Sequence, residues 1–235
     1  MTYTKRPDGR KFDEPRKMEA KVGIIKRADG SAMFKMGDTI AIAAVYGPRE
    51  LHPRFLQNPE RGTLRCVYDM LSFSVPDRKR PGPSRRGTEI SMVTENSLLS
   101  VVNLDQFPNA VVDVFINITQ ANAGTRCAGI NAAVMALADA GIPMRDLVSA
   151  ISVGKVGDKV VCDLDKDEED YEEGSTDIPV AIVPRTGEVI LLQLDGSIKK
   201  EELKEALKMA KKTCDDIYKI QKKALKKAYQ EFQNE

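Results

Sequence analysis

The sequence predicts an α+β fold, with two sets of antiparallel strands and helices inserted between them. Three observations support this prediction. Strand-like runs occur in pairs with hairpin turns between them. The stretch from residue 123 to residue 141 is almost entirely small or apolar, as in a buried helix. The C-terminal stretch carries one apolar stripe among lysines and glutamates, as in a helix packed on a sheet.

The first half of the chain opens with a polar segment and continues with strands. Residues 1–15 carry turn signals at Pro7-Asp8-Gly9 and should form an irregular arm. The separators "ADG" and "GD" that follow are typical of hairpin turns. Strands are expected at 18–27, 31–36, 39–47 and 63–75, with polar loops at 48–62 and 76–87.

The second half alternates helices with strands. Apolar residues at near-helical spacing predict a helix at 88–105, and the apolar helix that starts within 122–133 should end near Gly141. Further strands are expected at 110–121 and in two hairpins, at 147–165 and 177–196. The terminal helix carries its stripe at positions 203, 207, 210, 214, 217 and 220. With no linker visible, we expect one domain over residues 1–235.

Composition argues against several kinds of site. The net charge of the 235 residues is +1, so an anion site must arise from local clustering of positive side chains. His52 is the one histidine, and no Walker, GxSxG or HExxH motif occurs. The four cysteines lack CxxC spacing, which argues against zinc, and without a signal peptide they predict reduced thiols in the cytoplasm. No apolar run approaches the roughly 20 residues that span a membrane.

The stretch "NAGTRCAGINAA" places Gly124, Thr125 and Arg126 where a strand gives way to the buried helix. The first N–H groups of a helix have no internal partner, and the helix dipole adds positive potential there. With a planar guanidinium and a glycine that admits a ligand to the backbone, this motif predicts a phosphate cradle. The alternative, favoured for an isolated motif, is that Thr125 is an ordinary N-cap and Arg126 pairs with a carboxylate.

Two charged stretches are further candidates. The basic loop "DRKRPGPSRRG" suits a polyanion backbone, and its prolines reduce the entropy lost on binding. In the acidic stretch 163–177, Asp177 adjoins the start of a buried strand, where a carboxylate can hold a divalent metal or act as a general acid. The alternative is a solvated loop in both cases, and we accept it for most of the acidic residues. His52 and Arg54 are expected to be exposed.

Motifs spread along the whole chain resemble those of one family. They are "RPDGRK" (6–11), "RADGSA" (27–32), "GPRELHPR" (47–54), "KRPGPSRRGTEIS" (79–91), "QANAGTRCAGINAA" (120–133) and "DIPVAI" (177–182). The family is the RNase PH group of phosphorolytic nucleases. Within it, the chain most resembles the catalytic RNase PH-like subunits of the archaeal exosome.

The resemblance implies an RNase PH-type fold, with two βαβ-like halves of mixed or antiparallel sheet, helices between them and a long C-terminal helix. It also implies an enzyme that degrades RNA from the 3′ end with inorganic phosphate as co-substrate. The products are nucleoside diphosphates, and the reverse reaction adds tails to RNA. Phosphate is already an anionic nucleophile, so no histidine base is required. Arginine side chains can neutralise the charges of the phosphate and of the RNA backbone.

The resemblance assigns roles to residues of this sequence. Phosphate-binding residues are Gly124, Thr125 and Arg126. RNA-binding residues are Arg85 and Arg86 at the 3′ end, Arg80 in the same basic loop, and His52 and Arg54 on the path into a ring. The catalytic carboxylates, which are also the candidate ligands for Mg²⁺, are Asp177 and Asp170. The spacing from Asp170 to Asp177 is one residue longer than the family pattern, so Asp177 is the stronger candidate.

The resemblance further implies a hexameric ring of three heterodimers. In this ring the chain alternates with a related inactive subunit, beneath RNA-binding cap subunits, and takes in the 3′ end of single-stranded RNA. Two alternatives stay open: an RNA-guiding ring subunit without chemistry, and a homo-hexameric RNase PH that trims tRNA. The presence of both the phosphate motif and Asp177 favours the catalytic subunit.

Overall fold

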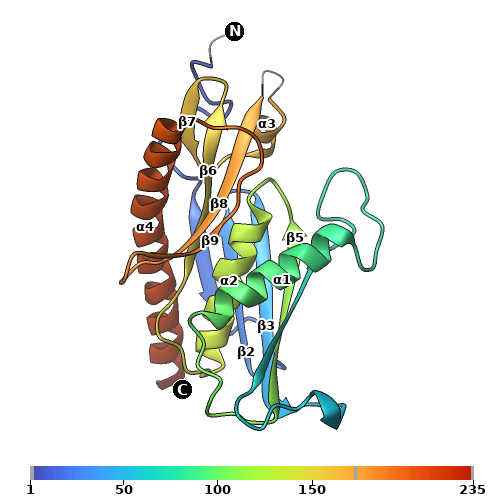
Figure 1. Cartoon of the computed structure of the whole chain (residues 1–235). Helices are drawn as coiled ribbons and strands as arrows, with labels where there is room; N and C mark the ends of the chain where they lie inside the picture. Colours follow the sequence, from blue (N-terminus) through green and yellow to red (C-terminus); the bar gives the residue numbers. More distant parts are fainter. Residues whose placement is uncertain (1–2, 172–173, 234–235) are drawn as a thin grey trace.

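The computed structural model describes residues 3–171 and 174–233, which form two sheets and the helices around them (Figure 1). The first sheet has five strands in the order β1-β2-β3-β5-β4. Its strands are β1 (Met18–Val22), β2 (Gly30–Met36), β3 (Thr39–Glu50), β4 (Thr63–Met70) and β5 (Ala110–Gln120).

One pair in this sheet departs from the expected antiparallel pattern. β4 runs parallel to β5, and helix α1 (Arg85–Leu99) connects them. A parallel pair needs such a crossover, because a hairpin can join only antiparallel neighbours. The expectation of antiparallel strands alone, which came from the strand patterns, is therefore wrong here. The mixed or antiparallel sheet that the resemblance implied is confirmed, and this sheet is mixed.

The second sheet has the order β7-β6-β8-β9, and all its neighbours are antiparallel. Its strands are β6 (Ser149–Val156), β7 (Lys159–Cys162), β8 (Ser175–Val183) and β9 (Glu188–Leu192). The one-turn helix α3 (Lys166–Glu169) lies between β7 and β8, and a capping box of Asp165 and Glu168 begins it. The acidic stretch was expected to be a solvated loop, but Asp163, Asp165 and Glu168 are buried.

Helix α2 (Thr125–Asp139) lies in the core and contacts both sheets, as its apolar sequence predicts. Close packing depends on its small residues, because a Cβ atom at Gly129 would lie 3.1 Å from Ile116. Asn131 is fully buried yet satisfied: its amide donates to the Ala150 carbonyl, and its carbonyl accepts from the Ala150 N–H. This pair of hydrogen bonds joins α2 to β6.

Helix α4 (Lys200–Gln233) runs past both sheets along one side of the molecule (Figure 1). Its stripe falls as predicted, with residues 210, 214 and 217 buried and residues 203, 207 and 220 packed at the edge of the core. One continuous apolar cluster includes residues of α2, α4 and both sheets. The single domain over residues 1–235 stays a prediction.

Several element boundaries differ from the expected ones. β1 ends at Val22 and β4 ends at Met70, both before the turns that follow them. Helix α1 covers 85–99 instead of 88–105, because the Ser84 side chain accepts a hydrogen bond from the Gly87 N–H and caps the helix. Arg85 and Arg86 therefore belong to the first helical turn and not to the basic loop.

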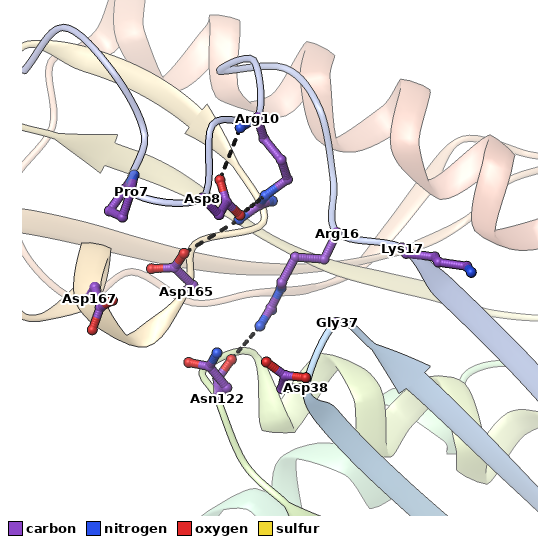
Figure 2. Close-up of a pocket in the computed structure, with 10 residues that line it drawn as sticks. All are labelled: Pro7, Asp8, Arg10, Arg16, Lys17, Gly37, Asp38, Asn122, Asp165 and Asp167. Atoms are coloured by element: carbon purple, nitrogen blue, oxygen red, sulfur yellow. Dashed lines mark hydrogen bonds and ion pairs between the residues drawn. The ribbon is translucent and has the colours of Figure 1, made fainter.

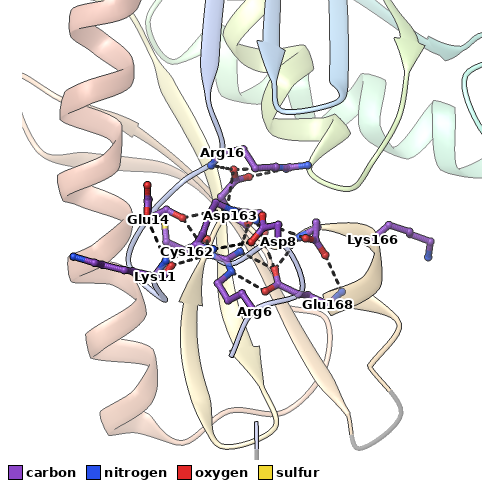
Figure 3. Close-up of polar contacts among 12 residues, drawn as sticks. Arg6, Asp8, Lys11, Glu14, Arg16, Cys162, Asp163, Lys166 and Glu168 are labelled. Carbon is purple, nitrogen blue, oxygen red and sulfur yellow. Dashed lines mark hydrogen bonds and ion pairs between the residues drawn. The ribbon is translucent and has the colours of Figure 1, made fainter. Parts of the chain in front are cut away.

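The N-terminal arm is irregular, as expected, but polar contacts fix it to the second sheet (Figure 3). The buried Arg6 guanidinium donates to both carboxylate oxygens of Glu168 at 2.7 Å, and the Tyr3 hydroxyl donates to the same carboxylate. Arg6 also donates to the carbonyls of Cys162 and Asp163. The arm therefore holds the connection from β7 into α3.

The four cysteines are free and buried, and burial raises the pKa of their thiols. Within the residues that the structure describes, no helix is both long enough and apolar enough to cross a membrane.

Candidate active site

A polar cavity of about 450 Å³ lies where the N-terminal ends of α1 and α2 meet the second sheet. Four of the sequence-predicted site residues line it: Arg86, Arg126, Asp170 and Asp177. They come from α1, α2, the end of α3 and β8. The fold therefore gathers two guanidinium groups and two carboxylates that are far apart in the sequence.

The turn before α2 is held in an unusual backbone conformation. Ala123 (φ 57°) and Gly124 (φ 63°) are both left-handed, which is costly for alanine. Thr39 fixes this turn, because its hydroxyl donates to the Ala123 carbonyl at 2.7 Å and accepts from the Asn122 N–H at 2.9 Å. Gly124 is the N-cap, so the expectation that Thr125 caps the helix is wrong. Thr125 is the first helical residue, and it is buried.

Gly124 faces the N-terminal arm. A Cβ atom at this position would lie 3.1 Å from the Arg16 Nη2 atom. Arg16 also donates to the Asn122 carbonyl, and both residues line a second cavity of about 410 Å³ (Figure 2). Neither Gly124 nor Thr125 lines the first cavity, so their assignment to phosphate stays a prediction.

Arg126 lines the first cavity and has two side-chain partners that line it too. Its Nη2 donates to Glu89 Oε2 at 3.3 Å, and its Nη1 donates to Gln193 Oε1. The alternative interpretation of the sequence, in which Arg126 pairs with a carboxylate, is therefore confirmed in this respect, and the carboxylate is that of Glu89. The Arg126 side chain is 18% exposed, which leaves it accessible from the cavity.

Asp177 lies on β8, beside β6, and the Ser152 hydroxyl donates to its carboxylate. Burial raises the pKa of the Asp177 carboxyl above its usual value, although the bond from Ser152 and the charges of Arg126 and Arg86 act in the opposite direction. A larger fraction of Asp177 is thus protonated at a given pH than of an ordinary, exposed aspartate.

Asp170 is placed differently. Its carboxylate is exposed, and the Lys166 ammonium donates to it at 2.6 Å. The neighbouring residue, Glu169, is partly buried in the same cavity. Burial, and next the charge of Asp177, raise the pKa of Glu169 to about 7. The charge of Asp177 therefore acts on Glu169 within this cavity.

Matches to models of known families cover most of the chain. Residues 14–143 match domain 1 of the 3′ exoribonuclease family, and residues 146–213 match domain 2 of that family. The chain belongs to the 3′ exoribonuclease family. It is a phosphate-dependent 3′→5′ exoribonuclease, as the motifs implied.

Relatives of this exoribonuclease carry the name exosome complex component Rrp41. Identity is 52% to the protein of Thermococcus gammatolerans, over 96% of this chain and 90% of the relative. It is 50% to that of Methanopyrus kandleri, over 95% and 93%. It is 46% to that of Nitrosopumilus maritimus, over 96% and 91%.

Solved structures with the same fold include rice Rrp46, with a TM-score of 0.84, 26% identity and coverage of 94% of this chain and 100% of the other. A second is a chain of the Archaeoglobus fulgidus exosome with RNA bound to the active site. Its TM-score is 0.77, its identity is 24%, and 91% of each chain is covered. At that identity the second likeness shows the fold alone.

The remaining predicted RNA contacts of this exoribonuclease lie outside the cavity. Arg85 is exposed one residue before Arg86, and Arg80 is exposed on the loop between β4 and α1. His52 and Arg54 are exposed on the loop after β3, where both lie within 4 Å of Glu50. The structure therefore confirms their exposure but does not bring them to Asp177.

The described residues do not form a convincing site for Mg²⁺. Asp170 is paired with Lys166, and within residues 3–171 and 174–233 no three His, Cys, Asp or Glu side chains converge as ligands. Magnesium held by Asp170 and Asp177 stays a prediction, and no step below depends on it.

Sequence reasoning missed several residues at the site, among them Ser152, Glu89, Glu169 and Gln193. One of them had a local signal, because Glu89 lies three residues after Arg86 and shares its helix face once Ser84 is recognised as the N-cap. Glu169 adjoins the predicted Asp170, whereas Gln193 reaches the cavity and Ser152 reaches Asp177 only through tertiary packing, for which a single sequence carries no signal.

Proposed function

We propose that this exoribonuclease is the phosphorolytic subunit of an exosome-type ring, and that the 450 Å³ cavity is its active site. One observation carries the proposal: Arg126, Arg86 and Asp177 line the same cavity. The two guanidinium groups suit a reaction between two anions, because fixed positive charge offsets their repulsion, and Asp177 is one of several carboxylates beside them that can move a proton.

Inorganic phosphate is the ligand proposed for Arg126 and the start of α2. A left-handed Gly124 followed by a helical Thr125 orients successive N–H groups in the manner of an anion-binding nest. The positive end of the helix dipole adds to this attraction. Arg86 then binds the backbone at the 3′ end of the RNA. Arg85 and Arg80 bind RNA further from the cavity. His52 and Arg54 lie along the RNA path.

In net terms the reaction moves one proton from the attacking phosphate to the departing 3′-oxygen, and Asp177 relays it in two transfers. A phosphate oxygen attacks the phosphorus of the last phosphodiester bond, and a new P–O bond forms. The bond to the 3′-oxygen of the preceding nucleotide breaks, which releases a nucleoside diphosphate. Asp177 in its protonated form gives its proton to the departing 3′-oxygen, and the proton of the attacking phosphate restores it. Asp170 is proposed as a second catalytic carboxylate beside Asp177.

The assembly belongs to the same proposal. Relatives with 46–52% identity are named exosome components, which supports a ring of three heterodimers with a related inactive subunit and RNA-binding caps. Four buried, free thiols support a cytoplasmic location, where thiols stay reduced.

Release of nucleoside diphosphates from poly(A) tests the chemistry. The ring reconstituted from this chain and its partner subunit should release them only when inorganic phosphate is present, and it should extend RNA when nucleoside diphosphates are supplied. Equal RNA loss without phosphate would contradict phosphorolysis.

Native mass spectrometry, together with assays of RNA binding and turnover, tests the two alternatives. A requirement for a second chain in the ring supports the exosome subunit, whereas an active homo-hexamer supports the tRNA-trimming enzyme. A ring with full RNA binding but no turnover under all conditions supports the RNA-guiding subunit.

A further inference from the structure

The Arg126 guanidinium belongs to a closed cycle of three side chains. It donates to Glu89 and to Gln193, and Gln193 Nε2 donates to Glu89 Oε1 at 3.0 Å. The three residues come from α1, α2 and the segment that follows β9. Each carboxylate oxygen of Glu89 therefore has a partner, and Glu89 is fixed with respect to the guanidinium.

Both hydrogen bonds of Arg126 in this cycle use its terminal nitrogens. The remaining nitrogen, Nε, is buried and has no hydrogen-bond partner among the described residues. A buried donor without an acceptor is unfavourable, so an anion that supplied an oxygen there would be stabilised. A guanidinium is planar, and fixing its two terminal nitrogens also fixes the direction of its Nε–H.

We propose that Glu89 and Gln193 are positioning residues that hold the Arg126 guanidinium in place, so that the N–H groups left free by the cycle receive the attacking phosphate. The inference rests on the proposed role of Arg126 in binding phosphate. It assigns Glu89 no contact with RNA or phosphate, and its effect is transmitted through the arginine.

A competing role for Glu89 predicts the opposite result. A carboxylate beside Arg126 can act as a substitute anion that phosphate must displace, and its removal would then tighten phosphate binding. The hydrogen bond from Gln193 favours positioning, because it restrains the carboxylate that would have to swing away. The two roles differ in the sign of the change in phosphate KM.

The test compares Glu89→Ala with Glu89→Gln in the full-length chain, assembled with its ring partner. Release of nucleoside diphosphates is measured against phosphate concentration. Glu89→Ala should raise the phosphate KM about tenfold, the size expected for one lost hydrogen bond to a charged group. The kcat at saturating phosphate and the Kd for RNA should stay within about twofold of wild type. Glu89→Gln keeps an acceptor oxygen and should restore the KM to within about threefold.

Two further variants sharpen the test. Gln193→Ala should raise the phosphate KM in the same direction. Glu95→Ala is the matched control: it removes the other carboxylate of α1, which accepts from the Cys66 N–H on β4 and does not line the cavity. Glu95→Ala should leave the phosphate KM unchanged.

Three outcomes would overturn the inference: an unchanged phosphate KM in Glu89→Ala, a lowered one, or a Glu89→Gln variant as defective as Glu89→Ala. Turnover by the wild-type ring that does not depend on phosphate would instead overturn the proposed function, so the two failures are distinguishable.

Discussion

The Asp163 carboxylate binds the Arg16 guanidinium with both of its oxygens. Arg16 Nε donates to Oδ2 at 2.9 Å, and Nη2 donates to Oδ1 at 2.7 Å. Both side chains are buried, and Arg16 also reaches the Asn122 carbonyl in the turn before α2. This ion pair therefore connects the arm, the second sheet and the proposed phosphate site.

Arg16→Ala should lower the free energy of unfolding by about 3–5 kcal/mol, because the buried Asp163 carboxylate loses both short hydrogen bonds from the guanidinium and keeps the longer ion pair with Arg10 at 3.7 Å. Urea denaturation followed by circular dichroism measures the change. The control is Lys17→Ala, which removes an exposed charge from the adjacent position and should cost less than about 0.5 kcal/mol. Equal stability of the two variants would contradict a structural role for the ion pair.

Asp177→Ala should reduce kcat roughly 10²–10⁴-fold, the usual contribution of a positioned general acid. RNA affinity, measured by fluorescence anisotropy, should persist. A parallel loss of RNA binding would argue that Asp177 organises the site and does not donate a proton.

Asp170→Ala should reduce kcat at least about tenfold less than Asp177→Ala does, because the Asp170 carboxylate is exposed and paired with Lys166. The same single-turnover assay compares the two. A loss as large as that of Asp177→Ala would place Asp170 in the chemistry despite its position in the structure.

Arg86→Ala should weaken RNA binding more than Arg85→Ala, since only Arg86 lines the cavity. If Arg86 neutralises one RNA phosphate, the slope of log Kd against log salt concentration should become shallower by roughly 0.7. Lys208→Ala, an exposed position on α4, serves as the control for loss of one positive charge. An unchanged slope in Arg86→Ala would exclude this contact.

Glu169 should make stability depend on pH. Its pKa of about 7 in the folded chain lies above the ordinary 4.5, so the folded state binds this proton more tightly than the unfolded state. The resulting stabilisation is complete below pH 4.5 and is lost as the pH rises through about 7. Glu169→Gln cannot titrate, so its Tm relative to wild type should rise between pH 5 and pH 8. A Tm difference that is constant with pH would contradict the prediction.

Most of the fold follows from local patterns in the sequence. The stripe on α4 and the apolar character of α2 predicted two helices whose burial the structure confirms. The strand patterns did not predict the parallel pairing of β4 with β5, because such patterns indicate which residues form strands but not which strands pair with each other. The start of α1 was missed because the capping serine lies among prolines, in a stretch that has the composition of a loop.

The candidate site was predicted in part. The motifs identified Arg86, Arg126 and Asp177, which the structure brings into one cavity. Glu89 had a local signal, but its pairing with Arg126 and Gln193 was not predictable, since Glu89 and Gln193 are 104 residues apart in the sequence and meet only when α1 packs beside β9. Likewise, the burial that raises the pKa of Glu169 depends on a one-turn helix that was expected to be an open loop.

Because α2 is covered by both sheets, the boundary between the two family matches, at residues 143 and 146, is not a seam in the core. A chain divided there would leave one face of α2 bare in the first fragment, and the second sheet would lose the surface on which it packs. Each fragment expressed alone should therefore aggregate. Expressed together, the two fragments should recover a native-like particle without a covalent link, as in fragment complementation.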